Sequence, residues 1–161
     1  MVTLASVQNI ESALELLAVN EETIGRLYST YANRFPESSE FWNGLAAGER
    51  SHATWIRKFK EESAGGDILL RPDRFKSPAI RMSINHTEGE IKAAAVGNMK
   101  PVNALSIANA IEQSLLESKF FEVFETDSAE LKRLLLKLRD ETREHARSVL
   151  ETWSRHRFSQ V

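Results

Sequence analysis

The sequence predicts an all-α fold, a four-helix bundle in which two antiparallel helical hairpins are joined by a long crossover. Four stretches of similar length repeat apolar residues every three or four positions, the period of an amphipathic helix. Short links join the first stretch to the second and the third to the fourth, and short links make neighbouring helices antiparallel. The remaining segment, residues 63–100, is long enough to run the length of the bundle. Since these segments use up the chain, we expect no sheet.

The first predicted helix covers residues 8–34. Its apolar residues are spaced alternately by four and three, and they are Ile10, Leu14, Leu17, Ile24, Tyr28, Tyr31 and Phe35. Pro36 ends the helix, because proline has no backbone N–H and restricts the residue before it. Glu21 fills the one vacancy in this apolar face, so the pattern places a carboxylate among core residues.

The second predicted helix covers residues 38–62 and ends before the pair Gly65-Gly66. One face carries, in order, Trp42, Leu45, Glu49, His52, Ile56 and Phe59. Glu49 and His52 therefore point to the core as well, at about the middle of their helix, as Glu21 does in the first.

The crossover, residues 63–100, contains the pattern Thr87 to Glu90, which resembles a capping box. We therefore expect a short helix at about 88–96. A mild basic cluster precedes it, made of Arg71, Arg74, Lys76 and Arg81. Polar, exposed loops are the rule in proteins, so we interpret this cluster as a solvated surface.

The third predicted helix covers residues 101–125 and begins at Pro101, a residue tolerated in a first helical turn. The fourth covers residues 128–156. Asp127 with Glu130 three residues later is a second capping-box pattern and marks its start. Two hairpins separated by one crossover then complete the predicted fold.

Composition limits the function. We expect one domain, residues 1–161, with 42% hydrophobic and 27% charged residues. The absence of cysteine excludes disulfides, thiolate zinc sites, iron–sulfur clusters and cysteine nucleophiles. A net charge of −2 argues against nucleic acid, including RNA at the crossover arginines, and against anionic membranes as partners. We find no signal peptide pattern and no apolar run of about 20 residues, and we expect a cytoplasmic protein.

Ionisable groups on the two core faces indicate a shared partner. A lone buried carboxylate is costly, so it must be neutralised, paired or bound to a metal. Glu49 and His52 form Glu-x-x-His, and this spacing puts carboxylate and imidazole on one helix face. Carboxylate oxygen together with imidazole nitrogen suits iron, manganese or zinc.

The segment Asn20–Ile56 resembles the first helix pair of rubrerythrins and their ferritin-like relatives. That family has a Glu followed seven residues later by Tyr, and then a Glu-x-x-His-Ala pattern. The matching residues are Glu21 with Tyr28, and Glu49-x-x-His52-Ala53. Residues 104–112 resemble the start of the family's third helix, and Leu134–Leu150 resembles the fourth. The resemblance covers most of the chain apart from the crossover.

The resemblance implies a ferritin-like bundle in which two helices each give a Glu and the other two each give a Glu-x-x-His to two metal ions. It implies iron, one or two ions, with manganese or zinc as alternatives, and reaction with oxygen or peroxide. Rubrerythrins also carry a cysteine-bound iron domain. This chain has no cysteine, so a redox-active protein would need an external electron donor. We also expect a homo-oligomer, most simply a dimer.

The fourth helix departs from the family pattern. His145 is present, but Thr142 stands three residues before it where the family has Glu. Glu141 is one residue away and can share a face with His145 at the i, i+4 spacing. That face also carries Leu134, Leu138 and Val149.

The third helix leaves its ligand position open. Glu112 shares a face with Ala108 and Leu116 and is preferred, with Ser114 and Glu117 as alternatives. The candidate metal ligands are Glu21, Glu49, His52, Glu112, Glu141 and His145. One metal, two metals or none are all compatible with this set. The alternative hypothesis is a non-enzymatic bundle, a scaffold or interaction protein with a degenerate site.

Overall fold

The structure, a computed structural model, describes residues 4–65, 68–70, 75–118 and 122–158. These residues are mainly helical, as predicted. The helices are α1 (Leu4–Arg34), α2 (Ser39–Ser63), α3 (Ser77–Val96), α4 (Pro101–Ser118) and α5 (Ala129–Phe158), and a 3-10 turn, η1 (Pro36–Ser38), links α1 to α2. Two short strands are β1 (Ile68–Leu70) and β2 (Phe124–Thr126).

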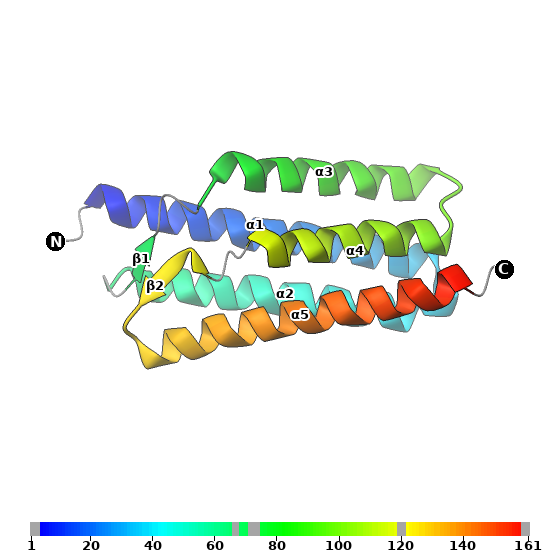
Figure 1. The fold of residues 1–161 in the computed structure, drawn as a ribbon. Helices are drawn as coiled ribbons and strands as arrows, with labels where there is room; N and C mark the ends of the chain where they lie inside the picture. The colour runs from blue at the N-terminus through cyan, green and yellow to red at the C-terminus, as the bar shows by residue number, and fades with distance from the viewer. Residues whose placement is uncertain (1–3, 66–67, 71–74, 119–121, 159–161) are drawn as a thin grey trace.

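The long helices lie roughly parallel or antiparallel to one another along one axis (Figure 1). α1 packs along α2, and α4 packs along α5, so each predicted hairpin is present. The two hairpins meet where α2 contacts α5, and α3 packs along α1. No helix in the described part of the chain is long and apolar enough to cross a membrane.

A small antiparallel sheet overturns the expectation that the chain has none. β1 pairs with β2 in the register Ile68–Thr126, Leu69–Glu125 and Leu70–Phe124. Ile68 and Phe124 are buried, and the ring of Phe124 lies 5.7 Å from that of Phe59 on α2. The predicted extension of the third helix to residue 125 is wrong for the same reason: the backbone of Phe124–Thr126 bonds to a distant segment instead of continuing a helix.

The crossover helix is longer than predicted. α3 begins at Ser77 instead of residue 88, with Pro78 in its first turn, where proline needs no N–H partner. Thr87 does not cap a helix, because its hydroxyl donates to the carbonyl of Ser83 inside α3. Gly66, Arg71 and Arg74, named in the sequence prediction, lie outside the described residues.

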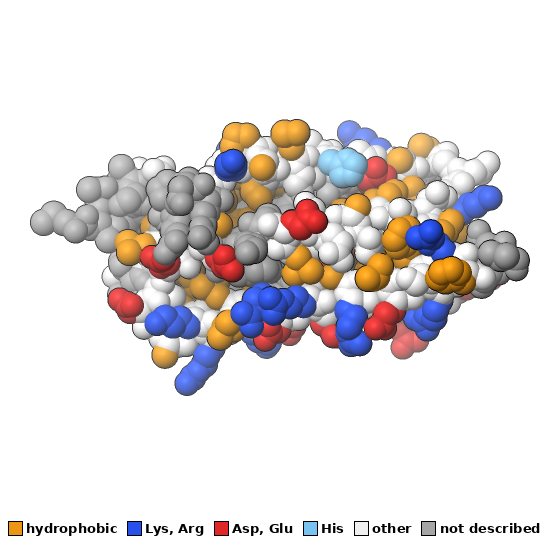
Figure 2. All heavy atoms as spheres, in the orientation of Figure 1, with side chains coloured by type: hydrophobic (Ala, Val, Ile, Leu, Met, Phe, Trp, Pro, Cys, Tyr) orange, Lys and Arg blue, Asp and Glu red, His pale blue; other side chains and the backbone are white. Residues whose placement is uncertain are grey.

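Small and polar side chains attach α3 to α1. Ser83 Oγ donates to Asn20 Oδ1 at 3.0 Å, and Arg26 on α1 pairs with Glu88. Thr87 and Ala94 are the buried residues of α3. Its outer surface is solvent-exposed and carries several hydrophobic side chains (Figure 2). α3 therefore covers α1, and its larger side chains Ile80 and Ile91 pack against the core while partly exposed.

The core of the bundle consists of two apolar clusters. One contains Tyr28, Trp42 and Leu105, and the other contains Leu14 and Phe59, each with further buried neighbours. Along α1, α2 and α5 the sequence passes from one cluster to the other, whereas the buried apolar residues of α4 belong to the first cluster. Of the ionisable residues predicted to face the core, Glu21, Glu49, His52 and Glu112 are buried in the layer where these clusters meet.

Candidate metal centre

Four ionisable side chains are almost completely buried in this middle layer. Glu21 on α1, Glu49 and His52 on α2, and Glu112 on α4 each have at most 1% of their surface exposed. The apolar face of α1, with its single carboxylate, is therefore as predicted. Because burial of an unpaired carboxylate is costly, the contacts of these groups decide how the fold tolerates them.

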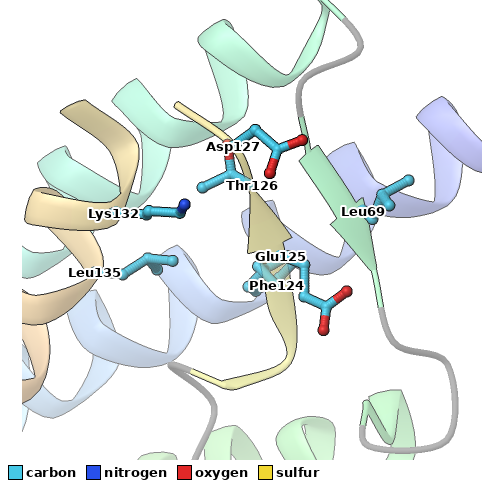
Figure 3. Close-up of a pocket in the computed structure, with 7 residues that line it drawn as sticks. All are labelled: Leu69, Phe124, Glu125, Thr126, Asp127, Lys132 and Leu135. Atoms are coloured by element: carbon cyan, nitrogen blue, oxygen red, sulfur yellow. The ribbon is translucent and has the colours of Figure 1, made fainter. Parts of the chain in front are cut away.

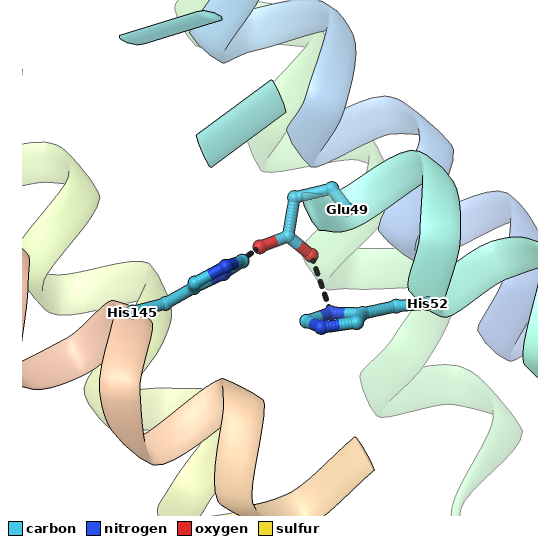
Figure 4. A group of neighbouring side chains, drawn as sticks. All are labelled: Glu49, His52 and His145. Atoms are coloured by element: carbon cyan, nitrogen blue, oxygen red, sulfur yellow. Dashed lines mark hydrogen bonds and ion pairs between the residues drawn. The ribbon is translucent and has the colours of Figure 1, made fainter. Parts of the chain in front are cut away.

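Glu49 lies at the centre of the group, between two histidines (Figure 4). Its Oε1 is 2.7 Å from Nδ1 of His145 on α5, and its Oε2 is 3.2 Å from Nδ1 of His52. The two imidazole rings stack with centroids 5.0 Å apart. One donor atom from each of the three residues lies within 4.8 Å of the others, so together they can hold a metal ion.

Two further carboxylates adjoin this triad. Glu21 Oε2 lies 3.3 Å from His52 Nδ1, the same nitrogen that faces Glu49. Glu112 accepts a hydrogen bond from the hydroxyl of Tyr28 at 2.6 Å through its Oε1. Its other oxygen, Oε2, is buried and has no hydrogen-bond partner among the described residues. An unsatisfied buried carboxylate oxygen fits a metal ligand, since a cation would satisfy it.

Burial shifts the ionisation of the outer carboxyl groups. Loss of solvent, followed by the negative charge of Glu49, raises the pKa of Glu21 well above its ordinary value. The pKa of Glu112 is raised for the same two reasons. Burial and the nearby Glu112 and Glu49 also raise the pKa of the Tyr28 hydroxyl. The raised pKa values of Glu21 and Glu112 favour the protonated carboxyl forms when no metal is bound.

Glu49 and His52 form the charged pair of the metal-free site. Burial opposes ionisation of Glu49, but hydrogen bonds with Glu21, His145 and His52 hold its pKa below the usual range. Burial also opposes protonation of His52, yet hydrogen bonds with Glu21 and Glu49 raise its pKa to about 11. These shifts favour a protonated imidazole beside an ionised carboxylate, and a bound cation would replace that proton.

Gly48 allows α5 to approach α2 at this layer. A Cβ atom added at Gly48 would overlap the imidazole of His145, 2.5 Å from its Nε2. The missing side chain therefore makes room for the ring that completes the triad. His145 is largely covered, with 13% of its side chain exposed.

Glu141 is not on the buried face of α5, contrary to the sequence prediction. Its side chain is 40% exposed, and its Oε2 reaches the far nitrogen of His52, Nε2, at 3.4 Å. Thr142 faces the core instead, with 1% exposed, and its hydroxyl donates to the carbonyl of Leu138 at 2.9 Å. The one-residue difference follows from helix geometry, because adjacent residues are about 100° apart around the axis.

On α4, Glu112 is the carboxylate that enters the core. The alternatives Ser114 and Glu117 are exposed. The sequence prediction did not identify Gly48 as part of the site or Tyr28 as the partner of Glu112. A glycine in the middle of a helix was the available signal for Gly48, since glycine weakens helices and often marks close packing.

A separate surface cavity of about 520 Å³ lies at the end of the bundle, between β2 and α5. Lys132 and Leu135 project into it from α5, opposite Phe124 and Thr126 (Figure 3). None of the candidate metal ligands lines it among the described residues. The cavity and the candidate metal site are therefore separate features of the structure.

Comparisons with protein families, curated proteins and solved structures find no match for this chain. The family resemblance noted in the sequence therefore stays a prediction, and the geometry of the buried site is the basis for a functional proposal.

Proposed function

We propose that this chain is a ferritin-like metalloprotein that holds one or two iron ions between its two helical hairpins. The observation that carries the proposal is the position of Glu49, whose two oxygens face Nδ1 of His52 and Nδ1 of His145. A carboxylate between two imidazole nitrogens, with Glu21 and Glu112 beside it, is a donor set that suits iron, manganese or zinc.

Each hairpin supplies part of the proposed ligand set. Glu21, Glu49 and His52 come from the α1–α2 hairpin, and Glu112 and His145 come from the α4–α5 hairpin. Glu49 would offer its two oxygens to bound cations. The Oε2 of Glu112, which has no hydrogen-bond partner among the described residues, supports a ligand role for that residue. Tyr28 holds Glu112 in position through its hydrogen bond.

Non-haem iron in such a site supplies redox chemistry with oxygen or peroxide. The carboxylates and histidines would bind the cation and release protons as it binds, and the two apolar clusters would keep water away from it. Since the chain has no cysteine, electrons would come from an external donor. The oxidoreductase assignment rests on the rubrerythrin resemblance, whereas metal binding rests on the geometry.

The alternative is a non-enzymatic bundle in which the same residues form a buried polar network. Thr142 favours this alternative, because its hydroxyl bonds to its own helix where the family has a ligand. The two proposals differ in metal content.

Metal titration tests the proposal. Protein treated with chelator should bind iron(II) or cobalt(II) at one or two ions per chain, and Glu49→Gln and His52→Ala should each reduce that binding strongly. His86→Ala is the matched control, because His86 lies on α3 with 65% of its side chain exposed. If the protein is folded without metal and has no affinity for these ions, the proposal is refuted and the non-enzymatic bundle is favoured.

A further inference from the structure

The two ring nitrogens of His52 face carboxylates on opposite sides. Nδ1 lies 3.3 Å from Glu21 and 3.2 Å from Glu49, both inside the core. Nε2, on the other edge of the ring, lies 3.4 Å from Oε2 of Glu141 on α5. Nε2 is buried and has no hydrogen bond within the described residues, so Glu141 is the carboxylate placed to receive its proton.

If a metal binds Nδ1 of His52, the hydrogen-bond partner of the other ring nitrogen, Nε2, affects how well the ring binds it. Nδ1 is the atom directed at the core carboxylates, so it is the one that would bind a cation there. A neutral imidazole that binds metal through one nitrogen keeps its proton on the other. Metal-binding histidines usually donate that N–H to a carboxylate, a carbonyl or water, which fixes the ring and strengthens the ligand.

Glu141 differs from the other acidic residues along this part of α5. Asp140 pairs with Arg139, and Glu144 pairs with Arg147, so both are neutralised by their own helix. Glu141 instead crosses to α2, and its contact with His52 is the ion pair it makes among the described residues. His145, on α5 like Glu141, stacks its ring on that of His52 and restricts the movement of the His52 ring.

We propose that Glu141 is a positioning residue: it accepts the Nε2 proton of His52 and holds the ring so that Nδ1 faces the metal. Its role is thus to orient a ligand, not to be one. This inference rests on the proposed metal site. Loss of such a partner typically weakens metal binding by about 10- to 100-fold.

A double-mutant cycle on zinc affinity distinguishes positioning from direct ligation. Glu141→Ala should weaken zinc binding about 10- to 100-fold in the wild-type background. In a His52→Ala background the same change should have little further effect, because the ring it orients is gone. In a His145→Ala background it should keep its full effect. Glu141→Gln, which retains an oxygen acceptor, should recover part of the affinity.

Glu144→Ala is the matched control, because Glu144 is an exposed carboxylate on the same helix. It should leave zinc affinity unchanged. Nitrogen-15 NMR of the zinc-loaded protein should show His52 protonated at Nε2. If Glu141→Ala weakens binding equally with and without His52, Glu141 is a ligand and the inference is wrong. If the wild type binds no zinc, iron or cobalt, the proposed function fails first, and the inference fails with it.

Discussion

Gly48 on α2 lies directly against the imidazole of His145 on α5, so closely that any side chain at residue 48 would overlap the ring. This contact joins the two hairpins at the layer where the ionisable residues meet. A substitution at Gly48 would therefore displace the proposed ligand His145 while every proposed ligand residue stays unchanged.

Gly48→Ala should reduce metal affinity about tenfold or more. Overpacking by one methyl group costs about 1–3 kcal/mol, and here the group that must shift is His145. Gly44→Ala is the control on the same helix, since a Cβ there meets nothing within 4 Å. That variant should bind metal normally and gain about 0.5–1 kcal/mol of stability. Isothermal titration with cobalt(II) measures the metal affinity of both variants. Equal affinities of Gly48→Ala and Gly44→Ala would contradict the role given to Gly48.

The stability of the metal-free protein should fall as pH rises above 6.5, the ordinary pKa of histidine. The His52 pKa is raised to about 11, so its stabilising contribution is complete below 6.5 and is lost as pH rises toward 11. Glu21 acts in the same direction, because its raised pKa means that the folded state binds its proton more tightly. Urea unfolding at a series of pH values measures the trend.

Bound metal should reverse this dependence, because the cation replaces protons and binds more tightly as pH rises. Glu21→Gln serves as the comparison, since the amide no longer titrates and the metal-free protein should depend less on pH. A metal-free protein that becomes more stable from neutral to alkaline pH would contradict the assigned protonation states.

Glu112→Gln should separate stability from metal binding. The amide oxygen still accepts the hydrogen bond of Tyr28. Burial raises the pKa of Glu112, so an uncharged side chain suits this position, and metal-free stability should change by less than about 1 kcal/mol. The increase in melting temperature on adding iron(II) or cobalt(II) should become smaller. Tyr28→Phe should instead cost about 1–2 kcal/mol without metal, because it leaves Glu112 Oε1 unpaired. Thermal unfolding with and without metal distinguishes these results.

Thr142→Glu should raise metal occupancy from about one ion per chain toward two. Thr142 is buried between the apolar clusters, at the position where the rubrerythrin-like pattern has a carboxylate. The additional buried carboxylate should destabilise the metal-free protein and be compensated by metal. Elemental analysis gives the stoichiometry, and two ions in both the wild type and the variant would mean that the wild-type residues already complete both positions.

Helical periodicity was sufficient to predict which residues of α1 and α2 enter the core. Burial within a long amphipathic helix follows from spacing along one chain segment, so Glu21, Glu49 and His52 could be placed from the sequence. The same reasoning selected Glu112 over Ser114 and Glu117.

Contacts between distant segments could not be predicted in this way. The pairing of β1 with β2 depends on segments more than fifty residues apart, and it ends the helical pattern before Phe124. The start of α3 at Ser77 was missed because the pattern from Thr87 to Glu90 was interpreted as the beginning of a helix, whereas Thr87 lies inside α3 and its hydroxyl bonds to the carbonyl of Ser83.

The sequence by itself determined an all-α chain with carboxylates and a histidine in the middle of its apolar helix faces. The tertiary structure decided how α5 is rotated against α2, and therefore that Thr142 is buried while Glu141 lies at the edge beside His52. Both residues fit the helical period, and a rotation of about 100° separates them. The packing of His145 against Gly48 accompanies that rotation, and contacts between helices are not encoded in the periodicity of either one.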